Sequence, residues 1–101
     1  MQRFPIPKTV RLSGRRVRLV VEKSAVLNRD TMGLHSPWNG TITLDSALAP
    51  DQQKATAVHE ILHDLDTLVG TGLSEKDVTA LASVLFAAIR DNPALMKWLM
   101  G

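Results

Sequence analysis

The sequence predicts a small α+β fold, with strands in the first half of the chain and helices in the second. Two observations carry this prediction: segments before residue 46 alternate apolar and polar residues in the strand period, and residues 50–100 hold apolar residues at helical spacing. Strands that precede the helices, instead of alternating with them, favour α+β over a doubly wound sheet. At 101 residues, 45% of them hydrophobic, the chain is expected to form one domain over residues 1–101.

Two pairs of strands are predicted, each closed by a turn. Thr9–Leu12 and Arg15–Glu22 flank Ser13-Gly14, which are residue types typical of a tight hairpin. Residues 31–35 and Thr41–Asp45 form the second pair, and the connecting segment contains proline and ends in Asn-Gly. We therefore expect a small, mostly antiparallel sheet.

The first long helix is predicted from Pro50 or Asp51 to about Val69. Proline suits an initial helical turn, and Gly70 can adopt the left-handed conformation that ends a helix. Apolar residues recur on one stripe of this helix, namely Val58, Ile61, Leu62, Leu65, Leu68 and Val69. Such a stripe indicates a helix that buries one of its faces.

The second helix is predicted to begin after Ser74, which would cap it while Asp77 serves as a shorter stand-in for the glutamate of a capping box. It should run to about Arg90. The turn at residues 70–72, which contains two glycines, can reverse the chain and lay this helix antiparallel against the first. Residues 91–93, Asp-Asn-Pro, then stop the helix and open a short third helix through Met100.

The composition limits the cellular compartment in which the protein is expected and the types of metal ligand that it can supply. No apolar run approaches the roughly 18 residues of a membrane span, and the N-terminus lacks the apolar core of a signal peptide. We therefore expect a cytoplasmic protein with no membrane partner. The chain has no cysteine, so a metal ion would have to be held by histidine and carboxylate side chains.

Positive charge is concentrated near the N-terminus, where residues 1–29 hold eight Lys and Arg against one acid. The arginines on the predicted strands are Arg11, Arg15, Arg16 and Arg18. They could contact nucleic acid or an acidic partner. A solvated sheet face is the simpler interpretation, because apolar residues alternate with them and the segment has neither interleaved aromatic residues nor a DNA-binding motif.

The strongest chemical signal is the pattern His-Glu-x-x-His at residues 59–63. Histidines four apart on a helix share one face, so the imidazoles of His59 and His63 can bind one metal ion. Glu60 is then placed to take a proton from a metal-activated water. The pattern predicts a zinc site, and the simpler alternative is two histidines satisfied by hydrogen bonds at the edge of a buried face.

A catalytic zinc site needs a third protein ligand besides the two histidines. Glu75 is the favoured candidate, because the reversing turn brings the start of the second helix toward the histidines. Asp77 is the alternative on the same helix, although both acids could merely complement the helix dipole. Asp66 could coordinate or accept an N–H from a ligating imidazole, and His35 could bind substrate or the oxyanion. Asp64 is expected to point away from the imidazoles.

These motifs resemble the small gluzincin-type zinc metallopeptidases, in particular the ImmA/IrrE-like group and the compact phage and prophage proteins called minigluzincins. The resemblance covers roughly residues 31–93. It implies a zincin-like minimal fold, with a sheet packed on the active-site helix and a third zinc ligand from the following helix, which falls on Glu75. ImmA/IrrE-like proteins often carry this glutamate in a Glu-x-x-x-Phe-Ala setting, which would instead align Asp77 with Leu81-Ala82.

The resemblance also implies a function. It predicts a zinc-dependent metallopeptidase that hydrolyses peptide bonds through a zinc-activated water, with Glu60 as general base. An edge strand at Thr41–Asp45 would pair with an extended protein or peptide substrate. A phage origin would place the protein in the cytoplasm of a bacterial host.

Two alternatives belong to other functional classes. The chain has no tyrosine to stabilise a tetrahedral oxyanion, which favours a weakly active or inactive protein-binding module that uses zinc for stability. The basic N-terminal segment allows a small nucleic-acid-binding protein with structural zinc.

Overall fold

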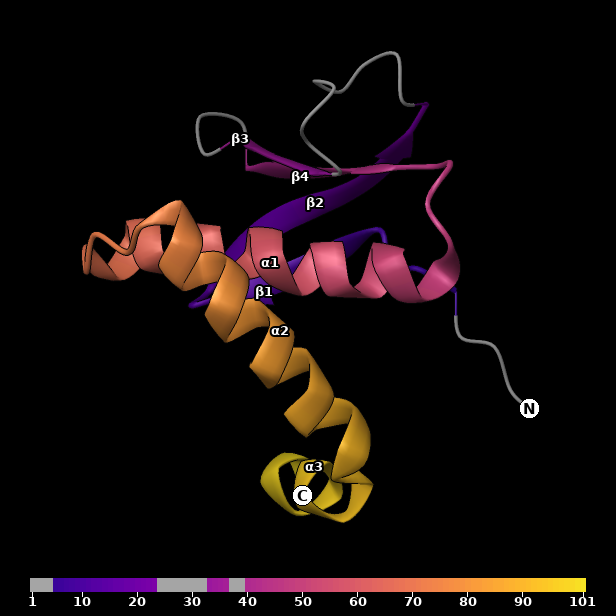
Figure 1. Cartoon of the computed structure of the whole chain (residues 1–101), viewed down its shortest axis with the longest axis vertical. Coiled ribbons are helices and arrows are strands. Elements are labelled where there is room, and N and C mark those ends of the chain that lie inside the picture. Colours follow the sequence, from indigo (N-terminus) through magenta and orange to yellow (C-terminus); the bar gives the residue numbers. More distant parts are fainter. Residues whose placement is uncertain (1–4, 24–32, 37–39) are drawn as a thin grey trace.

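The computed structural model describes residues 5–23, 33–36 and 40–101. Within these ranges the chain forms four strands followed by three helices (Figure 1). The elements are β1 (Thr9–Leu12), β2 (Arg15–Glu22), β3 (Gly33–Ser36), β4 (Thr41–Asp45), α1 (Pro50–Val69), α2 (Glu75–Asp91) and α3 (Pro93–Met100). The predicted α+β order is confirmed, and the predicted helix ends agree with the observed ones to within one residue.

The four strands form one sheet in the order β1-β2-β4-β3. The two outer pairs, β1 with β2 and β3 with β4, are antiparallel, as predicted. The central pair is parallel, with Arg18 of β2 opposite Thr41 of β4. Because β4 has a hydrogen-bonded neighbour on each side, the prediction that Thr41–Asp45 is an edge strand is wrong. In the described part of the chain, the edges of this sheet are β1 and β3.

The turn between β1 and β2 explains the first hairpin. Ser13 and Gly14 both have positive φ, 52° and 82°, as the two central residues of a type I′ turn require. In the second pair the described strand is Gly33–Ser36, so the predicted strand start at residues 31 and 32, and most of the predicted turn at residues 37–39, lie outside the described residues.

Helix α1 covers one face of the sheet (Figure 1), and the core lies between the two. Val17, Ile42 and Leu44 of the sheet are buried at its centre, and Ala57 and Ile61 of α1 pack against them. The predicted apolar stripe of α1 is only partly buried, since Leu68 and Val69 at its end are 44% and 71% exposed. The buried residues of this helix are the acids Glu60 and Asp64.

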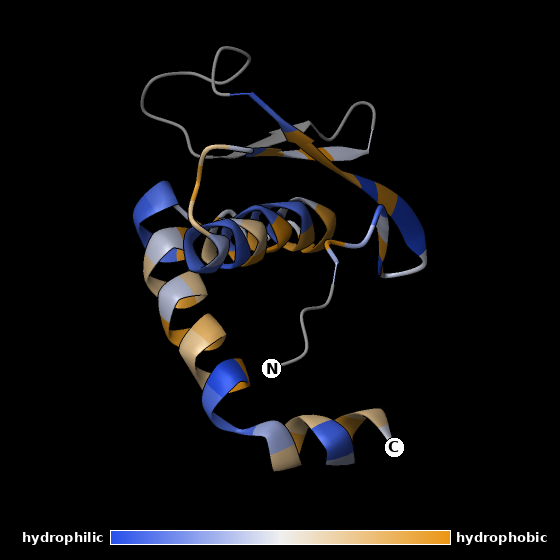
Figure 2. Ribbon diagram, turned by 90° about the vertical axis from the view of Figure 1, so that its right-hand side faces the viewer, coloured by the Kyte–Doolittle hydropathy of each residue, from blue (hydrophilic) through white to orange (hydrophobic). Residues whose placement is uncertain are grey.

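Helix α2 begins with the predicted capping box. The Ser74 hydroxyl accepts a hydrogen bond from the Asp77 amide at 3.1 Å, and the Asp77 carboxylate accepts one from the Ser74 amide at 3.3 Å. Figures 1 and 2 show α2 turning back across α1 and then running away from the sheet to α3. Helix α2 packs against α1, and its two buried residues are Val78 and Ala82. No helix among the described residues is long and apolar enough to cross a bilayer.

Candidate metal centre

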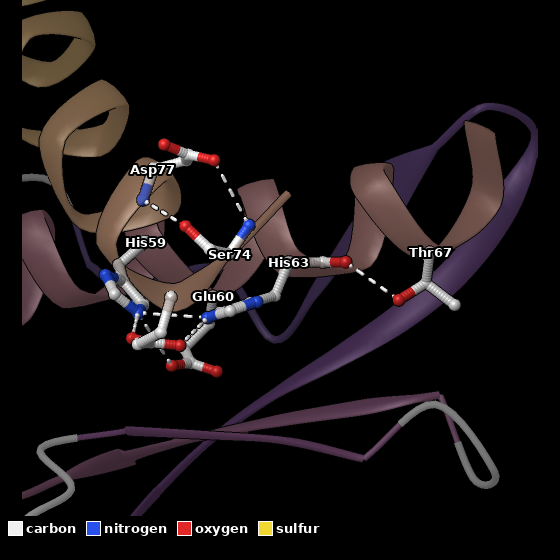
Figure 3. A network of polar contacts seen from close by, with 7 residues as sticks. His59, Glu60, His63, Thr67, Ser74 and Asp77 are labelled. Atoms are coloured by element: carbon white, nitrogen blue, oxygen red, sulfur yellow. Dashed lines mark hydrogen bonds and ion pairs between the residues drawn. The ribbon is translucent and has the colours of Figure 1, made fainter. Parts of the chain in front are cut away.

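The two histidines of the His-Glu-x-x-His pattern lie side by side on α1 (Figure 3). The ring centroids of His59 and His63 are 4.8 Å apart, and their Nε2 atoms are 3.1 Å apart. Positions four apart on a helix differ by little more than one turn, so both rings leave the same face. The helix therefore presents two imidazole nitrogens to a single point.

The carboxylate of Glu75, the first residue of α2, contacts both of these imidazole nitrogens. Its Oε1 lies 2.8 Å from Nε2 of His59, and its Oε2 lies 2.7 Å from Nε2 of His63. The placement follows from the turn before α2, where Gly70 ends α1 in the left-handed conformation with φ of 79°. The side chain of Glu75 is 69% exposed, so burial does not hold the carboxylate between the imidazoles.

If Glu75 is a carboxylate, protons alone do not satisfy the three contacts among these atoms. If both Nε2 atoms carry hydrogen, each can donate to Glu75, but two donors then face each other at 3.1 Å. If one Nε2 is unprotonated, it can accept from the other ring, but its lone pair then faces a carboxylate oxygen. A cation between His59, His63 and Glu75 resolves the conflict, because every one of these atoms can direct a lone pair at it.

The spacing of these donor atoms also suits a small divalent ion. Zinc binds nitrogen and carboxylate oxygen at about 2.0–2.2 Å in a tetrahedron, which places ligand atoms about 3.3 Å apart. The observed contacts of 2.7, 2.8 and 3.1 Å are shorter by a few tenths of an ångström. Small rotations of the exposed Glu75 side chain and of the two part-buried imidazoles would open the set to that spacing, so the residues fit the metal.

Glu60 lies beside His59, His63 and Glu75, but its carboxylate is farther from the His59 imidazole than that of Glu75 is. Its side chain is 9% exposed, and its Oε1 is 3.9 Å from Nε2 of His59. The ligand atoms of His59, Glu60 and His63 all lie within 4.8 Å of one another, and these three residues form a group that could hold a metal ion. Oε1 of Glu75 is more than 1 Å closer to Nε2 of His59 than Oε1 of Glu60 is, so Glu75 is the nearer carboxylate at this imidazole.

The other two acids considered as third ligands are engaged elsewhere. The carboxylate of Asp77 belongs to the capping box and lies apart from the imidazoles in Figure 3. Asp66 accepts hydrogen bonds from the Thr71 hydroxyl and from the Leu73 amide, the latter at 3.1 Å. The Thr71 hydroxyl is the main cause that lowers the pKa of Asp66 below its ordinary value of 3.8, and the Leu73 amide adds to it. Asp66 thus stabilises the turn that places Glu75 beside the imidazoles.

His35, considered above for binding substrate or the oxyanion, lies in β3, where its backbone pairs with Ile42. The side chain of His35 lies outside the described part of the structure.

Sequence reasoning missed the role of Asp64. The sequence predicted only that Asp64 points away from the imidazoles, whereas its side chain is buried and pairs with Arg15 of β2 at 2.5 Å. The strand period contained the signal: Arg15 shares its parity with Val17 and Leu19, which face α1, and not with the outward Arg16 and Arg18. The spacing along α1 supplies the second part of this signal, because Asp64 lies four residues after Glu60 and therefore on the same face of the helix.

The remaining arginines of the basic segment agree with a solvated sheet face. Arg11, Arg16 and Arg18 are exposed, and Arg11 lies directly opposite Arg16 in the β1–β2 pair. Like charges at paired positions repel each other and are tolerated best where water screens them. Arg15 is the exception, since it faces α1.

The chemistry available at this centre is inferred from the side chains that form it. Comparison with protein-family models, with curated proteins and with solved structures finds no match for the chain. The site combines two imidazoles, an exposed carboxylate and a buried carboxylate. Such a donor set suits a divalent metal ion with a base beside it.

Proposed function

We propose that the protein is a zinc-dependent metallopeptidase in which His59, His63 and Glu75 hold the metal and Glu60 is the general base. The observation that carries this proposal is the convergence of two Nε2 atoms and both Glu75 oxygens within 2.7–3.1 Å, with a buried carboxylate alongside. Histidine and carboxylate donors without cysteine favour zinc in a hydrolytic site over zinc in a thiolate-based structural site.

A bound zinc ion would supply Lewis acidity, which polarises a peptide carbonyl and makes water a better nucleophile near neutral pH. Glu60 would accept a proton from water as the water oxygen attacks the carbonyl carbon. It would then deliver that proton to the amide nitrogen as the C–N bond breaks, so that a carboxylic acid and an amine leave. Burial of Glu60 supports this role, because exclusion of bulk water strengthens a proton acceptor's interaction with its partner.

The resemblance to peptidases implies that an extended peptide adds to a strand edge. Because β4 is internal, the edge available on the β4 side of the sheet is β3 (Gly33–Ser36), which packs near α1. We propose that substrate pairs with β3 instead of β4.

The variant Glu60→Gln tests the mechanism. The substitution keeps the shape of the side chain and removes its basicity, so zinc content should remain at the wild-type level while hydrolysis of a denatured protein substrate falls at least about 100-fold. A Glu60→Gln protein with wild-type activity would refute the assignment. Wild-type protein that binds one zinc but cleaves nothing in a broad peptide library would favour the protein-binding module instead.

A further inference from the structure

The C-terminal arm, formed by residues 81–100 of α2 and α3, carries an unpartnered apolar surface. Eight large hydrophobic residues in this arm are 39–81% exposed, with Ile89 the least and Met100 the most accessible. Figure 2 shows hydrophobic residues along both helices after they leave the body of the molecule. Single exposed apolar residues are normal, but a cluster of this size marks an interaction surface.

This surface continues the buried stripe of α2. Val78 and Ala82 are 0% and 4% exposed where α2 lies on α1. Leu85 and Ile89 follow on the same stripe, at spacings of three and four residues, yet they are 41% and 39% exposed. The change occurs because α2 runs away from α1, so that the second half of the stripe is left partly exposed.

We propose that the arm is the interface of a homodimer, in which it packs against the arm of a second copy. If a large side chain has roughly 150–250 Å² of surface, the exposed fractions amount to roughly 700–1,100 Å² per copy. A standard stable interface needs about 800 Å² from each partner. Burial of most of this surface in the paired arms would therefore give a dimer interface of ordinary size.

The charge distribution favours a second copy as the occupant. In a two-fold symmetric dimer the same surface of each copy faces the other. A charged residue at the centre of that surface would therefore face the same charge on the second copy. Arg90 and Asp91 carry opposite charges and lie beside the α2 stripe, which itself holds none. Lys97, the one charge of α3, lies two residues from both Leu95 and Leu99, on the opposite face of that helix. Apolar residues therefore meet apolar residues in the paired arms.

The composition of the core supports the same conclusion. Among the described residues the buried hydrophobic side chains are Val17, Ile42, Leu44, Val78 and Ala82. This is a small core for a chain that is 45% hydrophobic. Pairing of two arms would bury a second apolar cluster that one copy cannot form.

The interface would be separate from the metal centre. Leu85 lies ten residues after Glu75, or about 15 Å along the helix axis. The dimer does not depend on zinc or on hydrolysis, so Glu75→Ala should leave the oligomeric state unchanged.

Sedimentation equilibrium tests the proposal on the full chain. At about 100 μM, above the micromolar Kd of a weak interface of this size, the wild type should have twice its 11.1 kDa mass. Leu85→Glu with Ile89→Glu should sediment as a monomer. The matched control Ser83→Glu, which adds a charge to the opposite face of the same helix, should remain a dimer. A monomeric wild type, or a dimeric double variant, would overturn the proposal, as would a monomer that binds phospholipid vesicles.

Cross-linking gives a second test that does not require the glutamate variants to fold. The chain has no cysteine, so Ala88→Cys introduces one thiol beside the apolar stripe of α2. Oxidation should link two copies of Ala88→Cys into a covalent dimer and leave Ser83→Cys monomeric. Equal cross-linking of the two variants would contradict the proposed interface.

Discussion

The guanidinium of Arg15 on β2 lies 2.5 Å from the carboxylate of Asp64 on α1, and this ion pair ties the N-terminal hairpin to the helix that carries both histidines. The Asp64 side chain is 1% exposed, whereas that of Arg15 is 40% exposed. A carboxylate buried next to His63 in the sequence is therefore compensated by a cation from a strand 49 residues earlier.

Replacement of Arg15 should destabilise the fold. Arg15→Met removes the guanidinium from a buried carboxylate, and we expect the free energy of unfolding to fall by about 2 kcal/mol, less than for a fully buried pair because Arg15 is partly solvated. Arg16→Met, at the outward position next to it, should cost less than about 0.5 kcal/mol. Urea denaturation measures both values, and equal losses for the two variants would contradict a special role for the pair.

Local features of the structure were predictable from the sequence, because their causes are local. The hairpin follows from Ser13-Gly14, and the ends of α1 and α2 follow from Gly70 and Ser74, whose conformations or hydrogen bonds involve near neighbours. The convergence of Glu75 with the histidines could be anticipated for the same reason, since only the short turn at residues 70–74 separates the two helices.

Long-range pairings were not predictable in this way. The parallel contact of β2 with β4 joins residues more than 20 positions apart, and nothing in either strand alone specifies it. The threonines of β4 made the strand look half-exposed, yet Thr41 and Thr43 are each only 9% exposed. The edge-strand prediction came from the family resemblance, and the order β1-β2-β4-β3 overturns it because β4 is paired on both sides.

The choice among the acidic ligand candidates can be tested by metal content. Glu75→Ala removes a donor that contacts both imidazoles, so zinc affinity should fall by more than about 100-fold, beyond the usual effect of losing an outer partner. Asp77→Ala removes only a helix cap and should keep full zinc affinity while it loses about 1 kcal/mol of stability. Mass spectrometry of both proteins after dialysis measures bound zinc. Loss of zinc in Asp77→Ala alone would reverse the assignment.

Asp66 should make stability depend on acidity. Its pKa is lowered in the folded protein, chiefly by the Thr71 hydroxyl, so the folded state binds a proton less readily than the unfolded state. This contribution is fully present above the ordinary value of 3.8 and is lost as the pH falls below 3.8 through the lowered pKa. The free energy of unfolding should therefore drop over this window.

Thr71→Val provides the matched variant, because it keeps the shape of the side chain and removes the hydroxyl. In urea titrations with EDTA present throughout, the loss of stability below pH 3.8 should be smaller for Thr71→Val and for Asp66→Asn than for the wild type. Identical pH profiles for the three proteins would show that the Asp66 contacts do not contribute.

Metal removal should lower the melting temperature, because zinc that binds only the folded chain adds its binding free energy to stability. At a free zinc concentration of about 1,000 times Kd this amounts to about 4 kcal/mol, which for a chain of this size corresponds to roughly 15–30 °C. EDTA should therefore lower the melting temperature of the wild type by that amount and leave His63→Ala unchanged. Calorimetry measures both. If EDTA shifts His63→Ala as far as the wild type, the stabilising metal does not bind at this centre.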